Sequence, residues 1–255
     1  MDYKNKGRLG GRAAVILGVL LMYAGIVGCT DERNDEAAPT DRDVLYQVST
    51  LDYLAQGAFD GSTPLRKMLR HGGFGLGTVN GLDGEMVIIE GRAYVVRGDG
   101  TTRQLDGSTQ IPFGMVTHFE PDTTHHLGRV DDYAAFRARL NDRLPVAEQG
   151  YAFRIDGAFD FLKTRSVDRQ EPPYPPLESV VADQSTFEFR NVEGTVVGVR
   201  LPESFGGVNA PGIHTHFVTS DRDGGGHVLD IRTDTMTVEV DRTPAVRIDL
   251  PGREP

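Results

Sequence analysis

Short apolar segments separated by turn signals constrain the fold of this chain most. Residues 86–90 and 93–97 flank the pair Glu90-Gly91, and Gly98-Asp99-Gly100 is a second turn signal. Further segments that look extended are residues 116–119, 153–155, 187–190 and 196–201, with a turn at Glu193-Gly194. Many short strands with few helices predict an α+β fold built on antiparallel or mixed β-sheets.

Three helices are expected among these strands. The first covers residues 49–59. The second covers residues 63–72, with Thr63 as its N-cap and Pro64 at its first position. The third is an amphipathic helix over residues 130–144, where apolar side chains recur near helical spacing.

Length and charge limit the class of protein. The chain has 255 residues, which is enough for one large domain or two small ones. Its formal net charge is −10 and it contains no tryptophan. A nucleic-acid-binding protein needs a basic surface and often an aromatic platform, so we expect no nucleic-acid partner.

The N-terminus has the features of an export signal. Four basic residues precede an apolar run over residues 13–27, which is too short for a comfortable membrane span of about 20 residues. The run closes on Ile26-Val27-Gly28-Cys29, which resembles the bacterial lipobox, and Cys29 is the single cysteine of the chain. The alternative is a short N-terminal anchor helix.

This pattern predicts three parts: a lipoprotein signal peptide over residues 1–28, an acylated Cys29 with a disordered tether to residue 43, and a folded domain over residues 44–255. We expect the protein to be exported and lipid-anchored to the cell envelope, in the outer membrane if the cell is Gram-negative. A single cysteine excludes an internal disulfide.

Candidate chemistry concentrates in residues 212–227. On a strand, the two-residue period places His214 and His216 on one face. The Asp- and Gly-rich segment 221–226 indicates a turn that returns His227 on the neighbouring strand. Three protein ligands plus an open position are typical of a catalytic zinc site. The alternative is a set of surface or hydrogen-bonded core histidines.

A glycine-rich stretch over residues 74–86 is the second candidate. Its glycines suit a backbone that a ligand or another chain approaches closely, and Glu85 enters the strand that follows. Taken alone, this stretch is typical of a turn-rich surface loop.

Several separated blocks resemble the α-acetolactate decarboxylase family in order and approximate spacing. They are residues 46–50, 60–61, 71–86, 163–167, 174–177, 212–216 and 225–230. The resemblance covers residues 44–251. It implies an α+β arrangement of two β-sheets, and a homodimer formed through the N-terminal part.

The resemblance also implies residue roles. The three zinc ligands of the family match His214, His216 and His227. Glu85 matches a glutamate over the metal that acts as an acid or base, and Arg165 matches an arginine that holds the substrate carboxylate. Thr78 matches a threonine near the substrate. Without the resemblance, Arg165 would be a solvated arginine on a strand.

The implied activity is that of a carbon–carbon lyase, which decarboxylates 2-acetolactate to acetoin and carbon dioxide. Loss of carbon dioxide leaves two electrons that flow into the adjacent ketone oxygen, giving an enediolate. Zn²⁺ can chelate the ketone and hydroxyl oxygens and neutralise this charge. Arg165 can bind the carboxylate with its planar fork, and Glu85 can protonate the enediolate.

Family members continue past the strand that matches residues 246–251 into a longer tail, which supplies a second glutamate. Glu254 is the acidic residue beyond Asp249 here and is the candidate for that catalytic role. Without a second glutamate, protonation falls to Glu85 alone or to water.

Two other functions stay open at this stage. One is a cupin-like metal oxygenase, which also uses His-x-His and a later histidine. The other is a catalytically inactive lipoprotein that binds a small keto-hydroxy acid. The remaining histidines receive no role: His71 ends a helix, and His118, His125 and His126 lie around a polar loop.

Overall fold

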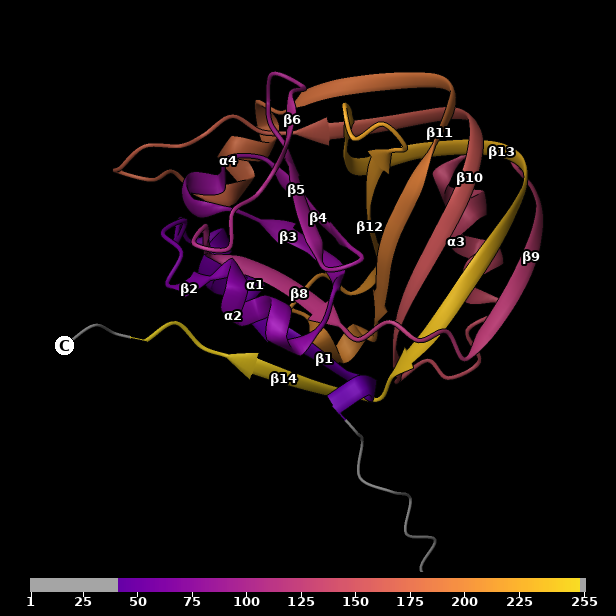
Figure 1. Cartoon of the computed structure of the whole chain (residues 1–255), viewed down its shortest axis with the longest axis horizontal. Helices are drawn as coiled ribbons and strands as arrows, with labels where there is room; N and C mark the ends of the chain where they lie inside the picture. Colours follow the sequence, from indigo (N-terminus) through magenta and orange to yellow (C-terminus); the bar gives the residue numbers. More distant parts are fainter. Residues whose placement is uncertain (1–40, 253–255) are drawn as a thin grey trace, which may run out of the picture. The chain divides into compact units, whose positions relative to one another are not determined.

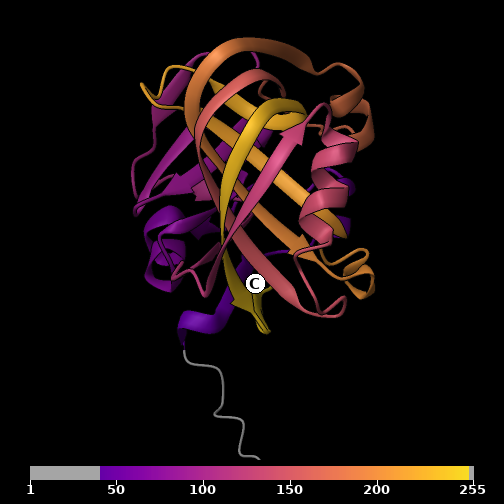
Figure 2. The same ribbon diagram turned by 90° about the vertical axis from the view of Figure 1, so that its right-hand side faces the viewer.

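The computed structural model describes residues 41–252, which fold into two β-sheets that pack against each other, with short helices between the strands (Figures 1 and 2). The expected signal peptide, Cys29, most of the tether and Glu254 lie outside the described residues. Within the described residues, the helices are too short or too polar to cross a membrane.

The first sheet is mixed. Its order is β14-β1-β8-β3-β4-β5-β6, and every neighbouring pair is antiparallel except β1 with β14. The strands are β1 (Val44–Val48), β3 (Phe74–Thr78), β4 (Glu85–Ile89), β5 (Arg92–Val96), β6 (Thr102–Gln104), β8 (Phe113–Thr117) and β14 (Ala245–Asp249). A separate two-stranded sheet pairs β2 (Thr63–Pro64) with β7 (Gln110–Ile111).

The second sheet is antiparallel and closes on itself. Its order is β10-β11-β12-β13-β9, and β10 pairs in addition with β13. The strands are β9 (Thr123–Val130), β10 (Gly150–Ser166), β11 (Ser185–Leu201), β12 (Gly212–Thr219) and β13 (Gly225–Thr243). The long strands β10, β11 and β13 bend strongly and form the curved wall on the right of Figure 1.

Side-chain caps explain where two helices begin. Thr50 accepts a hydrogen bond from the backbone of Tyr53 and starts α1, and Asp132 accepts one from Ala135 and starts α3. The helices are η1 (Asp41–Asp43), α1 (Leu51–Ala55), α2 (Leu65–Met68), η2 (Leu69–His71), η3 (Asn80–Leu82), α3 (Tyr133–Asn141), α4 (Leu177–Ala182) and η4 (Glu203–Phe205). Helix α3 buries Phe136 and Leu140, four residues apart, in the core of the second sheet.

The α+β prediction with two sheets is confirmed, as is the hairpin of β4 and β5 around Glu90-Gly91. The predicted turn at Glu193-Gly194 is wrong, because β11 runs without interruption from Ser185 to Leu201. Gly194 is there for another reason: a β-carbon would lie 2.4 Å from the Phe217 ring. The glycine marks close packing and not a turn.

Four local predictions also need correction. Thr63 and Pro64 pair with β7, so α2 begins only at Leu65, where Pro64 is the N-cap. Helix α1 ends at Ala55 and not near residue 59, since Gln56 is its C-cap. The third helix is shorter than residues 130–144, because Val130 still belongs to β9. His125 and His126 lie on β9 and not on a loop.

The glycine-rich stretch 74–86 is buried, so its interpretation as a surface loop is wrong. Its residues form β3, η3 and the first residues of β4, and all five residues of β3 are buried. Glycine allows this because strands pack closely there: a β-carbon on Gly75 would lie 1.9 Å from the Met115 carbonyl oxygen.

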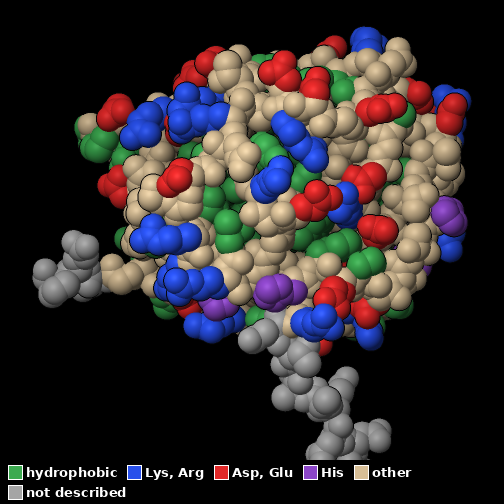
Figure 3. Space-filling model, in the orientation of Figure 1, with side chains coloured by type: hydrophobic (Ala, Val, Ile, Leu, Met, Phe, Trp, Pro, Cys, Tyr) green, Lys and Arg blue, Asp and Glu red, His purple; other side chains and the backbone are tan. Residues whose placement is uncertain are grey.

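Charges of both signs are interspersed on the face drawn in Figure 3, without a continuous basic surface on that face.

Asp241 on β13 carries a buried carboxyl whose pKa burial raises to about 7. Between its ordinary pKa of 3.8 and about 7, the unfolded chain is ionised while the folded chain keeps the proton, so folding stability falls as pH rises. The variant Asp241→Asn has no ionisable group at this position, so it should not lose folding stability in this pH range. We expect the variant to have a higher urea midpoint than the wild type at pH 8 and a similar one at pH 4. A lower midpoint at pH 8 would contradict the assignment.

Candidate metal centre and active site

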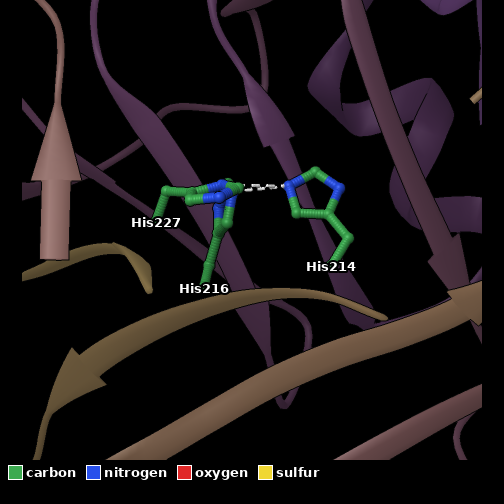
Figure 4. A group of neighbouring side chains, drawn as sticks. All are labelled: His214, His216 and His227. Atoms are coloured by element: carbon green, nitrogen blue, oxygen red, sulfur yellow. Dashed lines mark hydrogen bonds between the residues drawn. The ribbon is translucent and has the colours of Figure 1, made fainter. Parts of the chain in front are cut away.

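Three imidazoles converge where β12 meets β13. His214 and His216 are two residues apart on β12, and His227 on β13 pairs with His216 in the strand register. His214 Nε2 lies 3.2 Å from both His216 Nε2 and His227 Nδ1. Figure 4 shows the ring nitrogens turned toward one another.

The turn between the two strands brings His227 back to this place. Thr219 Oγ1 accepts hydrogen bonds from the backbone of Asp223 and Gly224 and so holds the turn closed. Gly226, just before His227, has a φ of +122°, and a β-carbon there would lie 2.4 Å from the Arg165 carbonyl oxygen. Only glycine permits that approach of β13 to β10.

The strand register places an arginine beside the histidines. Arg165 on β10 pairs with His227, which pairs with His216, so the three residues form a row across adjacent strands. The register between β10 and β13 shifts between Lys163 and Thr164. This irregularity sets which residue faces His227.

The other sheet supplies the carboxylate. Glu85 begins β4 opposite Thr78 of β3, and its side chain is buried between Arg165 and His216. Glu85 Oε1 accepts a hydrogen bond from Arg165 Nη1 at 2.5 Å, and Oε2 lies 3.3 Å from His216 Nε2. The site therefore combines residues from the two sheets that are far apart in the sequence.

The imidazoles are neutral and one of them is oriented by a backbone group. His216 Nδ1 donates to the Met86 carbonyl oxygen at 2.8 Å, which leaves the lone pair of Nε2 facing the cluster. Burial lowers the pKa of His214 and of His216 to about 3, and it lowers the pKa of His227 well below its usual value. Neutral imidazoles are the form that binds metal ions.

The spacing of the ring nitrogens fits zinc. At Zn–N distances of about 2.0–2.1 Å and tetrahedral angles, two nitrogen ligands lie about 3.3 Å apart, close to the 3.2 Å separations seen here. One ligand atom from each histidine lies within 4.8 Å of the others. These three residues therefore fit a zinc ion with an open coordination position.

A cavity of about 90 Å³ lies over His214 and His216. This volume is several times the roughly 10–15 Å³ that a cavity needs to hold one water molecule, so the cavity can admit a small ligand. Its polar lining consists of Thr78, Glu85, Arg165, His214 and His216. Its apolar lining consists of Leu51, Leu54, Leu82, Phe113, Val167, Leu177 and Val181.

Thr78 lines this cavity and also holds the turn before Glu85. Its Oγ1 donates to the Gly84 carbonyl oxygen at 2.7 Å. The hydroxyl proton is thus engaged within the protein, and the oxygen can offer a lone pair to the cavity.

Residues 45–255 match the family model described as alpha-acetolactate decarboxylase. The chain belongs to the alpha-acetolactate decarboxylase family. It is 44% identical to the alpha-acetolactate decarboxylase of Methanosarcina mazei over 82% of this chain and 73% of that protein. It is 38% identical to that of Bacillus subtilis strain 168 over 82% of both chains.

Solved structures of the family agree with the fold. The crystal structure of the Bacillus subtilis strain 168 enzyme superposes with a TM-score of 0.79 at 37% identity, covering 82% of this chain and 90% of that one. A Staphylococcus aureus protein of unknown function, described as similar to alpha-acetolactate decarboxylase, gives a TM-score of 0.78 at 30% identity. Membership in this family removes the cupin-like oxygenase alternative.

Sequence reasoning found the polar half of the site and missed the apolar half. The structure brings together six of the residues expected from the family resemblance: Thr78, Glu85, Arg165, His214, His216 and His227. The seventh, Glu254, lies outside the described residues. Leu51, Leu177 and Val181 come from two short helices far apart in sequence. No sequence period links such segments, so only the fold reveals them.

Proposed function

We propose that this chain is a zinc-dependent decarboxylase that converts 2-acetolactate to acetoin and carbon dioxide. The main support for the proposal is the buried cluster of three neutral imidazoles next to the Glu85–Arg165 pair. The chain's membership in this family supports it as well. The family resemblance also supports a homodimer as part of the proposal.

Zinc held by the three histidines would act as a Lewis acid toward the substrate's ketone and hydroxyl oxygens. Arg165 presents a planar, always-charged fork to the cavity, which suits the substrate carboxylate. Binding there aligns the bond between the carboxyl carbon and its neighbour for cleavage.

Glu85 is the proton donor of the proposal. In its acid form, it delivers a proton to the carbon that has lost the carboxylate, and water then restores that proton. Its position between Arg165 and His216 fixes the direction of delivery. A fixed direction favours one configuration of acetoin.

The apolar lining keeps water away from the reacting carbons. Leu54, Leu82, Phe113 and Val167 are buried around the cavity. Exclusion of water strengthens the electrostatic contacts of Arg165 and Glu85 with the substrate.

The experiment is product analysis with the full chain and racemic 2-acetolactate under nitrogen. The proposal predicts acetoin and carbon dioxide in equal amounts, without any need for oxygen. Bound zinc and bound substrate without acetoin would instead support the inactive binding protein.

We further propose that the protein is exported and anchored by lipid at Cys29, on the support of the basic segment, the apolar run and the lipobox-like residues. Cys29→Ser should remove incorporation of labelled fatty acid and leave the protein uncut, because acylation precedes cleavage at this kind of site. The readouts are label in the protein band and its mobility on a gel. Unchanged labelling would contradict the anchor.

A further inference from the structure

One wall of the active-site cavity is apolar and comes from two short helices. Helix α1 contributes Leu51 and Leu54, and α4 contributes Leu177 and Val181. Leu54 is buried, whereas the other three side chains are partly exposed. The partly exposed residues therefore stand at the mouth of the cavity.

Several contacts fix α4 against the segment that follows α1. Tyr174, three residues before α4, donates from its hydroxyl to Asp60 Oδ1 at 2.7 Å, and its ring lies 5.2 Å from the Phe59 ring. Gly57 leaves room for this packing, since a β-carbon there would lie 3.1 Å from the Pro175 carbonyl oxygen. The apolar wall is thus preformed.

Adjacent valines on α4 face different surroundings. Val180 is buried in the hydrophobic core, with 6% of its surface exposed, whereas Val181 lines the cavity. Successive helical residues point about 100° apart. Val181 is therefore in a position to touch a ligand, and Val180 is not.

The polar wall and the apolar wall of the cavity bind different parts of a ligand. The carboxylate and the oxygens of a 2-hydroxy-3-oxo acid belong on the wall of Arg165, Glu85 and the histidines. Its alkyl groups are then left to face Leu177 and Val181.

We propose that Leu51, Leu177 and Val181 form an apolar collar that sets how strongly the site discriminates against a larger alkyl group on a 2-hydroxy-3-oxo acid. The inference rests on the proposed function, whose site it deepens by naming residues that determine specificity. One methylene in an apolar pocket changes discrimination by about 10-fold to 200-fold.

The test is Val181→Ala in the full, zinc-loaded chain. We measure kcat/KM for 2-acetolactate and for its homologue with an ethyl group on the hydroxyl-bearing carbon. The ratio of the homologue to 2-acetolactate should rise by about 10-fold. Val181→Leu should lower the same ratio, because the longer side chain narrows the mouth.

Val180→Ala is the matched control, since it makes the same change one residue away, outside the cavity. Its ratio should match the wild type. An unchanged ratio in both Val181 variants, or an equal shift in Val180→Ala, would overturn the collar.

A binding assay tests the collar without relying on turnover. We compare two inert hydroxy acids, 2-hydroxy-2-methylpropanoate and 2-ethyl-2-hydroxybutanoate, by calorimetry. Val181→Ala should improve binding of the larger acid relative to the smaller by about 10-fold. A shift in binding without any acetoin formation by the wild type would uphold the collar and reject the decarboxylase; no shift would reject the collar alone.

Discussion

Replacing His216 with alanine is expected to abolish stoichiometric zinc binding and to reduce acetoin formation by about a thousandfold or more. Lewis-acid stabilisation is worth several kcal/mol, and each 1.36 kcal/mol corresponds to a factor of ten in rate. His216 is buried at 1% exposure and its Nε2 lies 3.2 Å from His214 Nε2 and 3.3 Å from Glu85 Oε2, so its loss removes one of the three imidazoles of the cluster. Metal content and turnover are measured on the same sample.

His126→Ala provides the matched control. His126 is exposed on β9, and its ring contacts Thr237 Oγ1 and not the cluster. We expect normal zinc content and normal turnover in this variant. Full activity of His216→Ala with bound zinc would show that the metal site lies elsewhere.

Replacing Glu85 with glutamine should leave zinc bound and reduce kcat by about 10²-fold to 10⁴-fold, the usual range for loss of a general acid or base. Glutamine keeps the size of the side chain and can still accept a hydrogen bond from Arg165, but it cannot deliver a proton. The configuration of the remaining acetoin should become mixed if water protonates instead. Chiral chromatography of the product reports this directly.

The control for that change is Glu90→Gln. Glu90 is exposed in the turn after β4 and pairs with Arg154 at 3.4 Å, away from the cavity. Its kcat should equal that of the wild type. A Glu85→Gln enzyme with wild-type kcat and one configuration of acetoin would remove Glu85 from the mechanism.

The convergence of the three histidines was predictable because its signal is local. His214 and His216 obey the two-residue period of one strand, and a turn rich in glycine returns His227 to the neighbouring strand. The Glu90-Gly91 hairpin and the core of α3 were predictable for the same reason. The spacing of residues within one strand or helix, together with the turn residues, was enough to predict these features.

The contacts between the two sheets were not predictable from such patterns. Glu85 and Arg165 are 80 residues apart, and the irregular register of β10 against β13 decides that Arg165 faces His227. The family resemblance predicted both residues, but only the fold explains why they are in contact. Local periods contain no information about which strands become neighbours.

The strand β11 shows a related limit. Glu193-Gly194 has the composition of a turn, yet Gly194 is needed because the Phe217 ring of β12 packs against its backbone. Turn propensity and close packing both select glycine, and the sequence does not distinguish them.

We propose that decarboxylation depends on zinc bound by the three histidines. The most direct measurement is a zinc titration of the chelated full chain, with the rate of acetoin formation followed at each addition. We predict no turnover in the chelated protein and a linear rise that ends at about one zinc per chain, as expected for a single catalytic site. Full turnover in the metal-free protein, or no turnover with one zinc bound, would rule out zinc-dependent decarboxylation at this site.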